Sequence, residues 1–159
     1  MGRTTNYDNR RVSLNIYGKG FNYYSDAEQP VTTTLNGETG GFVCAGIAKL
    51  CQSVLITLLS DNVIFDPQWG SELPRYVTGG SASVLGANIG SIMSMSFSSV
   101  IGQLRRNERA DAPNDERIKT LTLTKWAYLE SGTGISITIN VQSMAGESRD
   151  VVIPLGLTV

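Results

Sequence analysis

The first regular pattern in the chain is a helical one that begins near Val43. Its apolar residues recur every three or four positions, which places them on one face of a helix. They are Ile47, Leu50, Cys51, Val54, Leu55, Leu58 and Leu59. We expect this helix to bury that face and to end near Ser60. Two prolines and a glycine follow between Val63 and Pro74, and they predict an ordered loop without regular structure.

A second helix is predicted from about Ser83 to Leu104, with Ser81 or Ser83 as its N-cap. Its core face carries Leu85, Ile89, Ile92, Met93, Phe97, Val100, Ile101 and Leu104. The opposite face has no charged residue, although a solvated helix face normally carries several. It consists of Ser83, Ala87, Asn88, Ser91, Ser94 and Ser98. We therefore expect contacts on both sides of this helix, with Ser91 and Ser94 at the outer contact.

From Ile118 onward the hydrophobic period changes from helical to alternating, as in strands. For the first strand, residues 118–129, the expected apolar face is Leu121, Leu123, Ala127 and Leu129, and the expected opposite face is Thr120, Thr122, Thr124, Trp126 and Tyr128. Turn sequences at 131–134 and 145–148 separate it from strands at 135–141 and 150–155. The pattern predicts an α+β fold in which two helices pack on a C-terminal three-stranded antiparallel meander.

Residues 1–40 differ in composition from the rest and hold four of the six tyrosines. Alternation around Leu14 and the turn signal Asn36-Gly37 predict a β-rich N-terminal arm. The remaining residues, 41–159, are expected to form one domain. Gly18-Lys19-Gly20 is interpreted as a hairpin turn, because it lacks the wider spacing of a phosphate-binding loop.

The charge content excludes several classes of function. The chain has 13 Lys and Arg, 14 Asp and Glu and no histidine. Nucleic-acid recognition needs a basic excess on one face, so no nucleic-acid partner is expected. Without histidine, the Ser–His and Cys–His nucleophile pairs and most mixed-ligand zinc sites are impossible.

The cysteines and the apolar runs predict a chain without metal, cofactor or membrane span. Cys44 and Cys51 lie on the first predicted helix with Cα atoms about 10 Å apart, too far for a disulfide. We interpret them as buried thiols in a reducing compartment. The run from Tyr76 to Leu104 has no charge, but it has too many Ser and Gly residues for a membrane span. The polar N-terminus resembles no signal peptide, so we expect a cytosolic protein without a membrane partner.

Charges concentrate in residues 105–119, which hold five basic and four acidic residues. One interpretation is a solvated connector between the second helix and the first strand. The other is a polar docking surface for another subunit. The sequence pattern is compatible with both.

The order of these features resembles a known family. Its motifs here are Leu58-Leu59, Pro67-Gln68-Trp69-Gly70, Asp115-Glu116-Arg117-Ile118 and Val152-Ile153-Pro154-Leu155. Together they make residues 42–156 similar to the small baseplate wedge protein of contractile-tailed phages. The family also includes a baseplate subunit of type VI secretion systems. The family's Glu-Pro-Arg junction appears here as Asp115-Glu116-Arg117, without the proline.

The resemblance implies a structural subunit present in each wedge of a six-fold baseplate. Its partners would be larger wedge subunits and the first ring of tail sheath protein, which would meet an edge of the sheet. The resemblance implies partner contacts at Asp115, Glu116 and Arg117, and we add Trp69 from the ordered loop. Such a protein would assemble in the host cytoplasm and reside in the virion tail baseplate, or in another contractile injection system.

A glycan-cleaving enzyme is the alternative, because the family was once labelled lysozyme-like. That chemistry needs two carboxylates on either side of the glycosidic bond. Glu72 and Asp66, near Trp69, are the one plausible pair. Their loop is short and rich in proline, and few aromatic residues remain to line a sugar groove, so we expect no enzyme activity.

Overall fold

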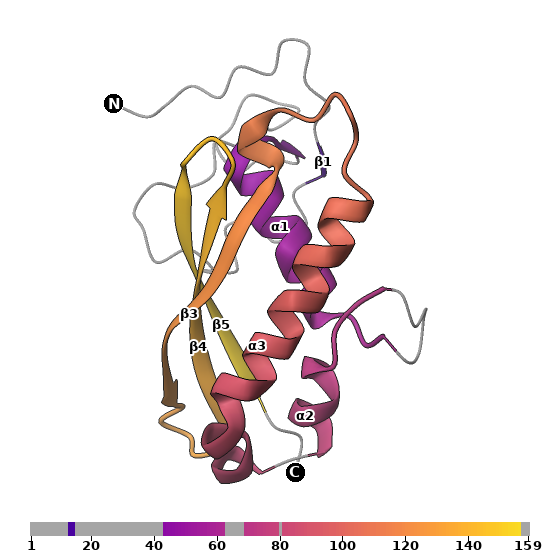
Figure 1. Ribbon diagram of the computed structural model, residues 1–159. Coiled ribbons are helices and arrows are strands. Elements are labelled where there is room, and N and C mark those ends of the chain that lie inside the picture. The colour runs from indigo at the N-terminus through magenta and orange to yellow at the C-terminus, as the bar shows by residue number, and fades with distance from the viewer. Residues whose placement is uncertain (1–12, 15–42, 63–68, 80, 157–159) are drawn as a thin grey trace, which may run out of the picture.

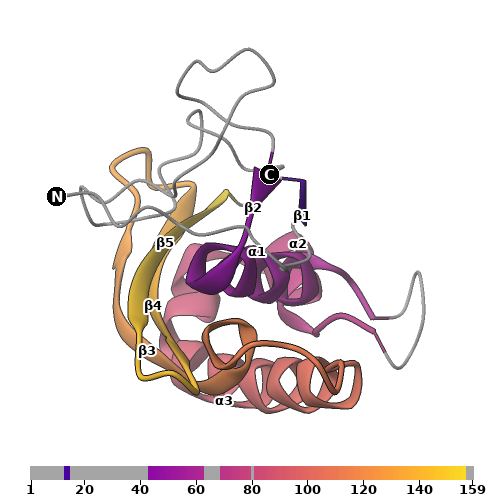
Figure 2. The ribbon, with the colours of Figure 1, turned by 90° about the horizontal axis from the view of Figure 1, so that it is seen from above.

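The computed structural model describes residues 13–14, 43–62, 69–79 and 81–156. Helices α1 (Gly46–Leu59) and α3 (Ala82–Arg106) lie on the same side of a sheet of β3 (Ile118–Tyr128), β4 (Gly134–Ser143) and β5 (Ser148–Gly156) (Figures 1 and 2). A short helix, α2 (Leu73–Gly79), and a 3-10 turn, η1 (Asn114–Glu116), complete the domain. The predicted α+β architecture is confirmed.

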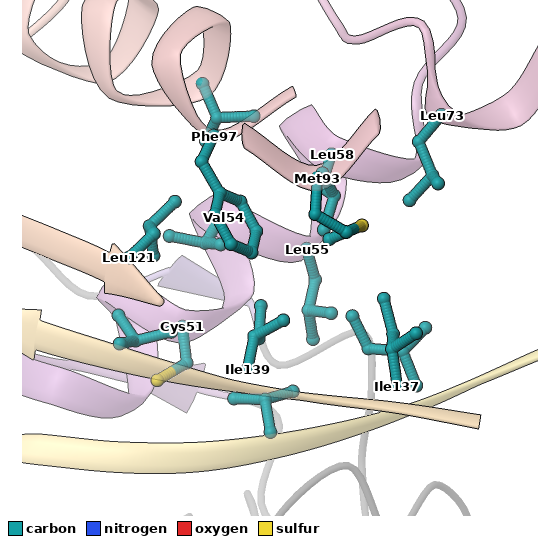
Figure 3. Packing of buried hydrophobic residues seen from close by; sticks show 14 of the residues in the cluster. Cys51, Val54, Leu55, Leu58, Leu73, Met93, Phe97, Leu121, Ile137 and Ile139 are labelled. Carbon is teal, nitrogen blue, oxygen red and sulfur yellow. The ribbon is translucent and has the colours of Figure 1, made fainter. Parts of the chain in front are cut away.

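The sheet has the order β3-β4-β5, and both pairs are antiparallel. The central strand β4 carries the fully buried residues Ile135, Ile137, Ile139 and Val141 at alternate positions. These side chains face the helices, and Figure 3 shows residues from α1, α3 and the sheet meeting in one cluster. The alternation predicted for β4 therefore corresponds to a single buried face.

A β-bulge between Leu123 and Lys125 changes the faces of β3 from those predicted. Before it, Leu123 lies opposite Ile139, and after it Trp126 lies opposite Ile137. Because directly opposed residues share a face, Trp126 and Tyr128 lie on the helix side of the sheet. The sequence prediction placed them on the opposite face and was wrong, because an extra residue in a strand reverses the alternation after it.

Helix α1 begins later than predicted. Val43–Cys44 form strand β2, which pairs with Ser13–Leu14 (β1). Cys44 therefore does not lie on the helix with Cys51, and the helical separation estimated for the two thiols does not apply. The prediction failed because an apolar pair just before a helix fits either period. The other turns predicted in the arm fall outside the described residues.

The segment predicted as irregular up to Pro74 ends instead in helix α2, which begins at Leu73. Pro74 is compatible with this helix because the N–H groups of a first turn have no intrahelical acceptor. The hydroxyl of Ser71 accepts from Leu73 N at 3.1 Å and donates to Leu58 O at 2.6 Å. Residues 63–68 lie outside the described part of the chain.

Helix α3 starts and ends close to the predicted positions. Ser81 is its N-cap, and Val84 N donates to the Ser81 hydroxyl. Among the described helices, α3 alone is long and apolar enough to cross a bilayer by length and composition, and 44% of its most apolar window is buried. That buried face packs against β3 and α1, as expected for a core helix.

Candidate functional site

A cleft of about 420 Å³ lies where α1, the end of α3 and the connector 107–113 meet. In Figure 1 this connector joins the upper end of α3 to η1 and passes close to the start of α1. The cleft is lined by Lys49, Leu50, Ser53, Ile56, Trp69, Leu104, Asn107, Glu108, Arg109, Asp111, Ala112, Pro113, Glu116 and Ile118. Its walls therefore combine apolar side chains with five charged ones.

Glu116 is held inside the fold at the wall of the cleft. Its Oε2 lies 2.6 Å from Lys49 Nζ, and its Oε1 accepts from Gly46 N at 3.1 Å. Gly46 is the first residue of α1, whose N-cap Ala45 has no side chain that can cap it. A carboxylate at a helix N-terminus satisfies a free N–H and interacts favourably with the helix dipole. The Glu116 side chain is only 8% exposed, so it acts first as a structural group.

Several other charged residues in and beside the connector also bond within the chain. Arg117 Nε faces Glu108 Oε1 at 2.8 Å, and Arg109 contacts Asp111. Arg105 Nη2 donates to Lys119 O at 3.1 Å. These contacts connect the end of α3 to the start of β3. The segment between them is therefore held by bonds within the chain and also presents a polar surface.

Asp115 and Arg117 lie at the turn that precedes β3. Asp115 is in η1, and Arg117 is the residue that follows η1. The turn closes through Glu116 N to Pro113 O at 2.9 Å, and β3 begins only at Ile118. Both side chains are partly buried, and neither lines the cleft.

Trp69 lines the cleft because the next residue is clamped to α3. The side-chain amide of Gln103 bonds both backbone groups of Gly70, accepting from its N–H at 2.8 Å and donating to its carbonyl at 2.6 Å. Gly70 has φ +96°, and a Cβ there would lie 2.3 Å from Ser60 O. Sequence reasoning missed Gln103, although a glutamine beside the core face of a helix is a detectable signal. It also missed Lys49, which no pattern distinguished.

The outer face of α3 is separate from the cleft. Ser91 and Ser94 are exposed there and do not line the cleft. Two polar side chains of this face bond the helix itself: Asn88 donates to Val84 O, and the Ser98 hydroxyl donates to Ser94 O. Trp69 and Glu116 therefore line the cleft, whereas Ser91 and Ser94 lie on a different surface.

The carboxylates of the enzymatic alternative do not gather at the cleft. Glu72 is exposed and does not line it, and Asp66 falls outside the described residues. Within the described ranges, no group of three or more acidic or cysteine side chains is arranged to hold a metal ion. What the cleft offers is apolar contact surface with a charged rim.

No protein-family model, no curated protein and no solved structure matches this chain.

Proposed function

We propose that this protein is a structural subunit of a contractile-tail baseplate wedge. In this proposal it joins larger wedge subunits and offers an edge of its sheet to the first ring of sheath protein. The order of elements supports it: a core helix, a loop with Trp69, a long helix, an acidic-X-Arg-Ile junction and a final hairpin. This is the order on which the family resemblance rests.

The open edge of β5 is the observation that carries the proposal. β5 pairs with β4 over nine residues without a register shift, and within the described chain nothing pairs with its other edge. Edge strands are normally protected, and adding a partner strand is a common way to assemble subunits. By contrast, β3 has two register irregularities, which disturb its outer edge.

Val152 offers a way to block the β5 edge without breaking the sheet. Val152 and Pro154 occupy ladder positions two residues apart, opposite Thr138 and Ser136. Proline has no N–H to donate to β4, and in strands it is accepted where its nitrogen faces the edge. By the alternation of an antiparallel ladder, the Val152 N–H also points outward. Val152→Pro therefore removes one edge donor and keeps the bonds to β4.

The experiment compares particles assembled with wild-type protein, Val152→Pro and the control Val152→Thr, which keeps the N–H. Mass spectrometry of purified tail particles measures incorporation, and electron microscopy measures sheath assembly. We expect wild type and Val152→Thr to be incorporated and to support sheaths, and Val152→Pro to fold but to lose sheath attachment. Absence of the wild-type protein from the particles would refute the proposal.

A further inference from the structure

Three segments that are far apart in the sequence meet at one end of the domain. They are the start of α1, the 3-10 turn η1 and the turn between β4 and β5, residues 144–147 (Figure 1). The turn between β3 and β4, residues 129–133, lies at the opposite end of the sheet. The sheet therefore has two hairpin turns, and only one of them lies beside η1.

Two backbone hydrogen bonds join η1 to the β4–β5 turn. Met144 N donates to Arg117 O at 2.9 Å, and Ala145 N donates to Asn114 O at 3.1 Å. The two acceptors are the first residue of η1 and the residue that follows η1. Because both acceptors belong to one short turn, a displacement of η1 moves both of them. The position of the β4–β5 turn therefore depends on η1 as well as on the turn's own bonds.

A side chain joins η1 to helix α1. Glu116, the last residue of η1, accepts from Gly46 N at 3.1 Å and pairs with Lys49 at 2.6 Å. Both contacts involve the first turn of α1. The 3-10 turn is thus bonded on one side to the start of α1 and on the other to the β4–β5 turn.

We propose that η1 is a conformational junction, which couples the order of the first turn of α1 to the order of the β4–β5 turn. Disturbing either segment weakens bonds that hold η1, and η1 then holds the other segment less firmly. Coupling of this kind is reciprocal. Because β5 begins at Ser148, directly after the turn, a partner strand on the β5 edge would also order the start of α1. That consequence rests on the proposed function, whereas the coupling is a property of the isolated chain.

The two hairpin turns provide a matched pair of variants. Gly146 of the β4–β5 turn has φ +85°, and Gly132 of the β3–β4 turn has φ +69°. A Cβ at either position would have no atom within 4 Å. Alanine is therefore strained at both positions by the backbone alone. Gly146→Ala disturbs the turn beside η1, and Gly132→Ala disturbs the turn at the other end of the sheet.

Amide hydrogen exchange of the full chain, resolved by NMR, measures the effect of each variant. The Gly46 N–H reports on the first turn of α1. The Ile139 N–H, in the central strand, corrects for any difference in global stability. After this correction, we expect exchange at Gly46 to be about fivefold faster or more in Gly146→Ala than in Gly132→Ala, the lower end of ordinary coupling between sites. Equal exchange at Gly46 in the two variants would overturn the inference.

Glu116→Ala tests the coupling in the other direction. It removes the contacts with α1 but leaves in place the backbone carbonyls that accept from Met144 and Ala145. We expect faster exchange at both of these N–H groups, and a smaller rise in Glu116→Gln, which retains an oxygen for Gly46 N. Gln103→Ala, which removes bonds outside this junction, is the control for a general loss of stability.

Wild-type exchange at Met144 and Ala145 in a folded Glu116→Ala protein would also refute the coupling. Neither experiment needs a partner. Failure of the coupling is therefore distinct from failure of the proposed function, which is measured by incorporation into tail particles.

Discussion

At the scale of single residues, two side chains form hydrogen bonds with backbone groups that are distant in sequence, and these bonds fix the positions of the segments they join. Gln103 does this for Gly70 and Glu116 does it for Gly46. Neither role follows from hydrophobic periodicity, because each contact joins segments far apart in sequence. The sequence analysis selected Glu116 for its place in a motif, and the structure gives it a capping role that the motif alone does not reveal.

Gln103→Ala should destabilise the protein by about 2–4 kcal/mol, because it leaves the buried N–H and carbonyl of Gly70 without their partner. Urea unfolding followed by tryptophan fluorescence measures the change. Gln142→Ala is the control, since its bond to Thr120 is exposed and its loss should cost less than about 0.5 kcal/mol. Equal free energies of unfolding for the two variants would show that the hydrogen bonds between Gln103 and Gly70 do not stabilise the fold.

Replacing Glu116 separates its two contacts. Glu116→Ala removes the α1 cap and the Lys49 partner, and we expect a loss of about 1–3 kcal/mol. Glu116→Gln retains an oxygen for Gly46 N and should lose less. The check is a pair of chemical denaturation curves, with Glu130→Ala at an exposed position as the surface control. A larger loss in Glu116→Gln than in Glu116→Ala would show that the cap is not the main contribution.

At the scale of elements, the sequence predicts those whose period is long and unbroken. α3 and the strands β3, β4 and β5 appear near their predicted positions because most of their apolar residues face one core. The errors occur where one or two residues decide the outcome: the bulge before Lys125, the strand at Val43–Cys44 and helix α2. Such choices depend on tertiary partners, which the local pattern does not contain.

Two glycines of α3 provide a test on one helix. A Cβ at Gly90 would have no atom within 4 Å, whereas a Cβ at Gly86 would lie 2.7 Å from Tyr128 Oη and 3.0 Å from Trp126. Gly90→Ala should stabilise the protein by about 0.5–1 kcal/mol, because alanine loses less conformational entropy in a helix. Gly86→Ala should stabilise the protein less than Gly90→Ala does, or should destabilise it, because its methyl group displaces the rings of Tyr128 and Trp126. Thermal melting of the two variants should rank Gly90→Ala above Gly86→Ala, and the reverse order would contradict the packing.

At the scale of the whole molecule, two surfaces are available besides the sheet edge: the cleft and the outer face of α3. The sequence predicted that α3 has an uncharged face, and the structure shows this face exposed, with Val84 at 59% and Met95 at 52%. The cleft was beyond sequence reasoning, because its walls come from segments up to about seventy residues apart. The sequence showed that the connector is rich in charged residues, but it did not show that these residues form ion pairs with one another and with Arg117.

Charged substitutions on the outer face of α3 test whether it contacts another subunit. We expect Ser91→Arg and Ser94→Glu to leave the isolated protein folded, because both positions are exposed. In an assembly, an unpaired charge buried at an interface costs several kcal/mol, so both variants should fail to enter particles. Circular dichroism checks the fold, and particle composition checks incorporation. Normal incorporation of both variants would mean that this face remains in water.

The cap on α1 also has a consequence for the order in which the chain acquires structure. The bond between Gly46 N and Glu116 Oε1 joins residues 70 positions apart. During synthesis, the α1 segment leaves the ribosome before Glu116 has been made. Closing so long a loop is slow compared with forming a helical turn, so the first turn of α1 should become protected late. Pulse-labelling hydrogen exchange during refolding should show Gly46 protected together with β3, after the middle of α3; protection of Gly46 before β3 would exclude this order.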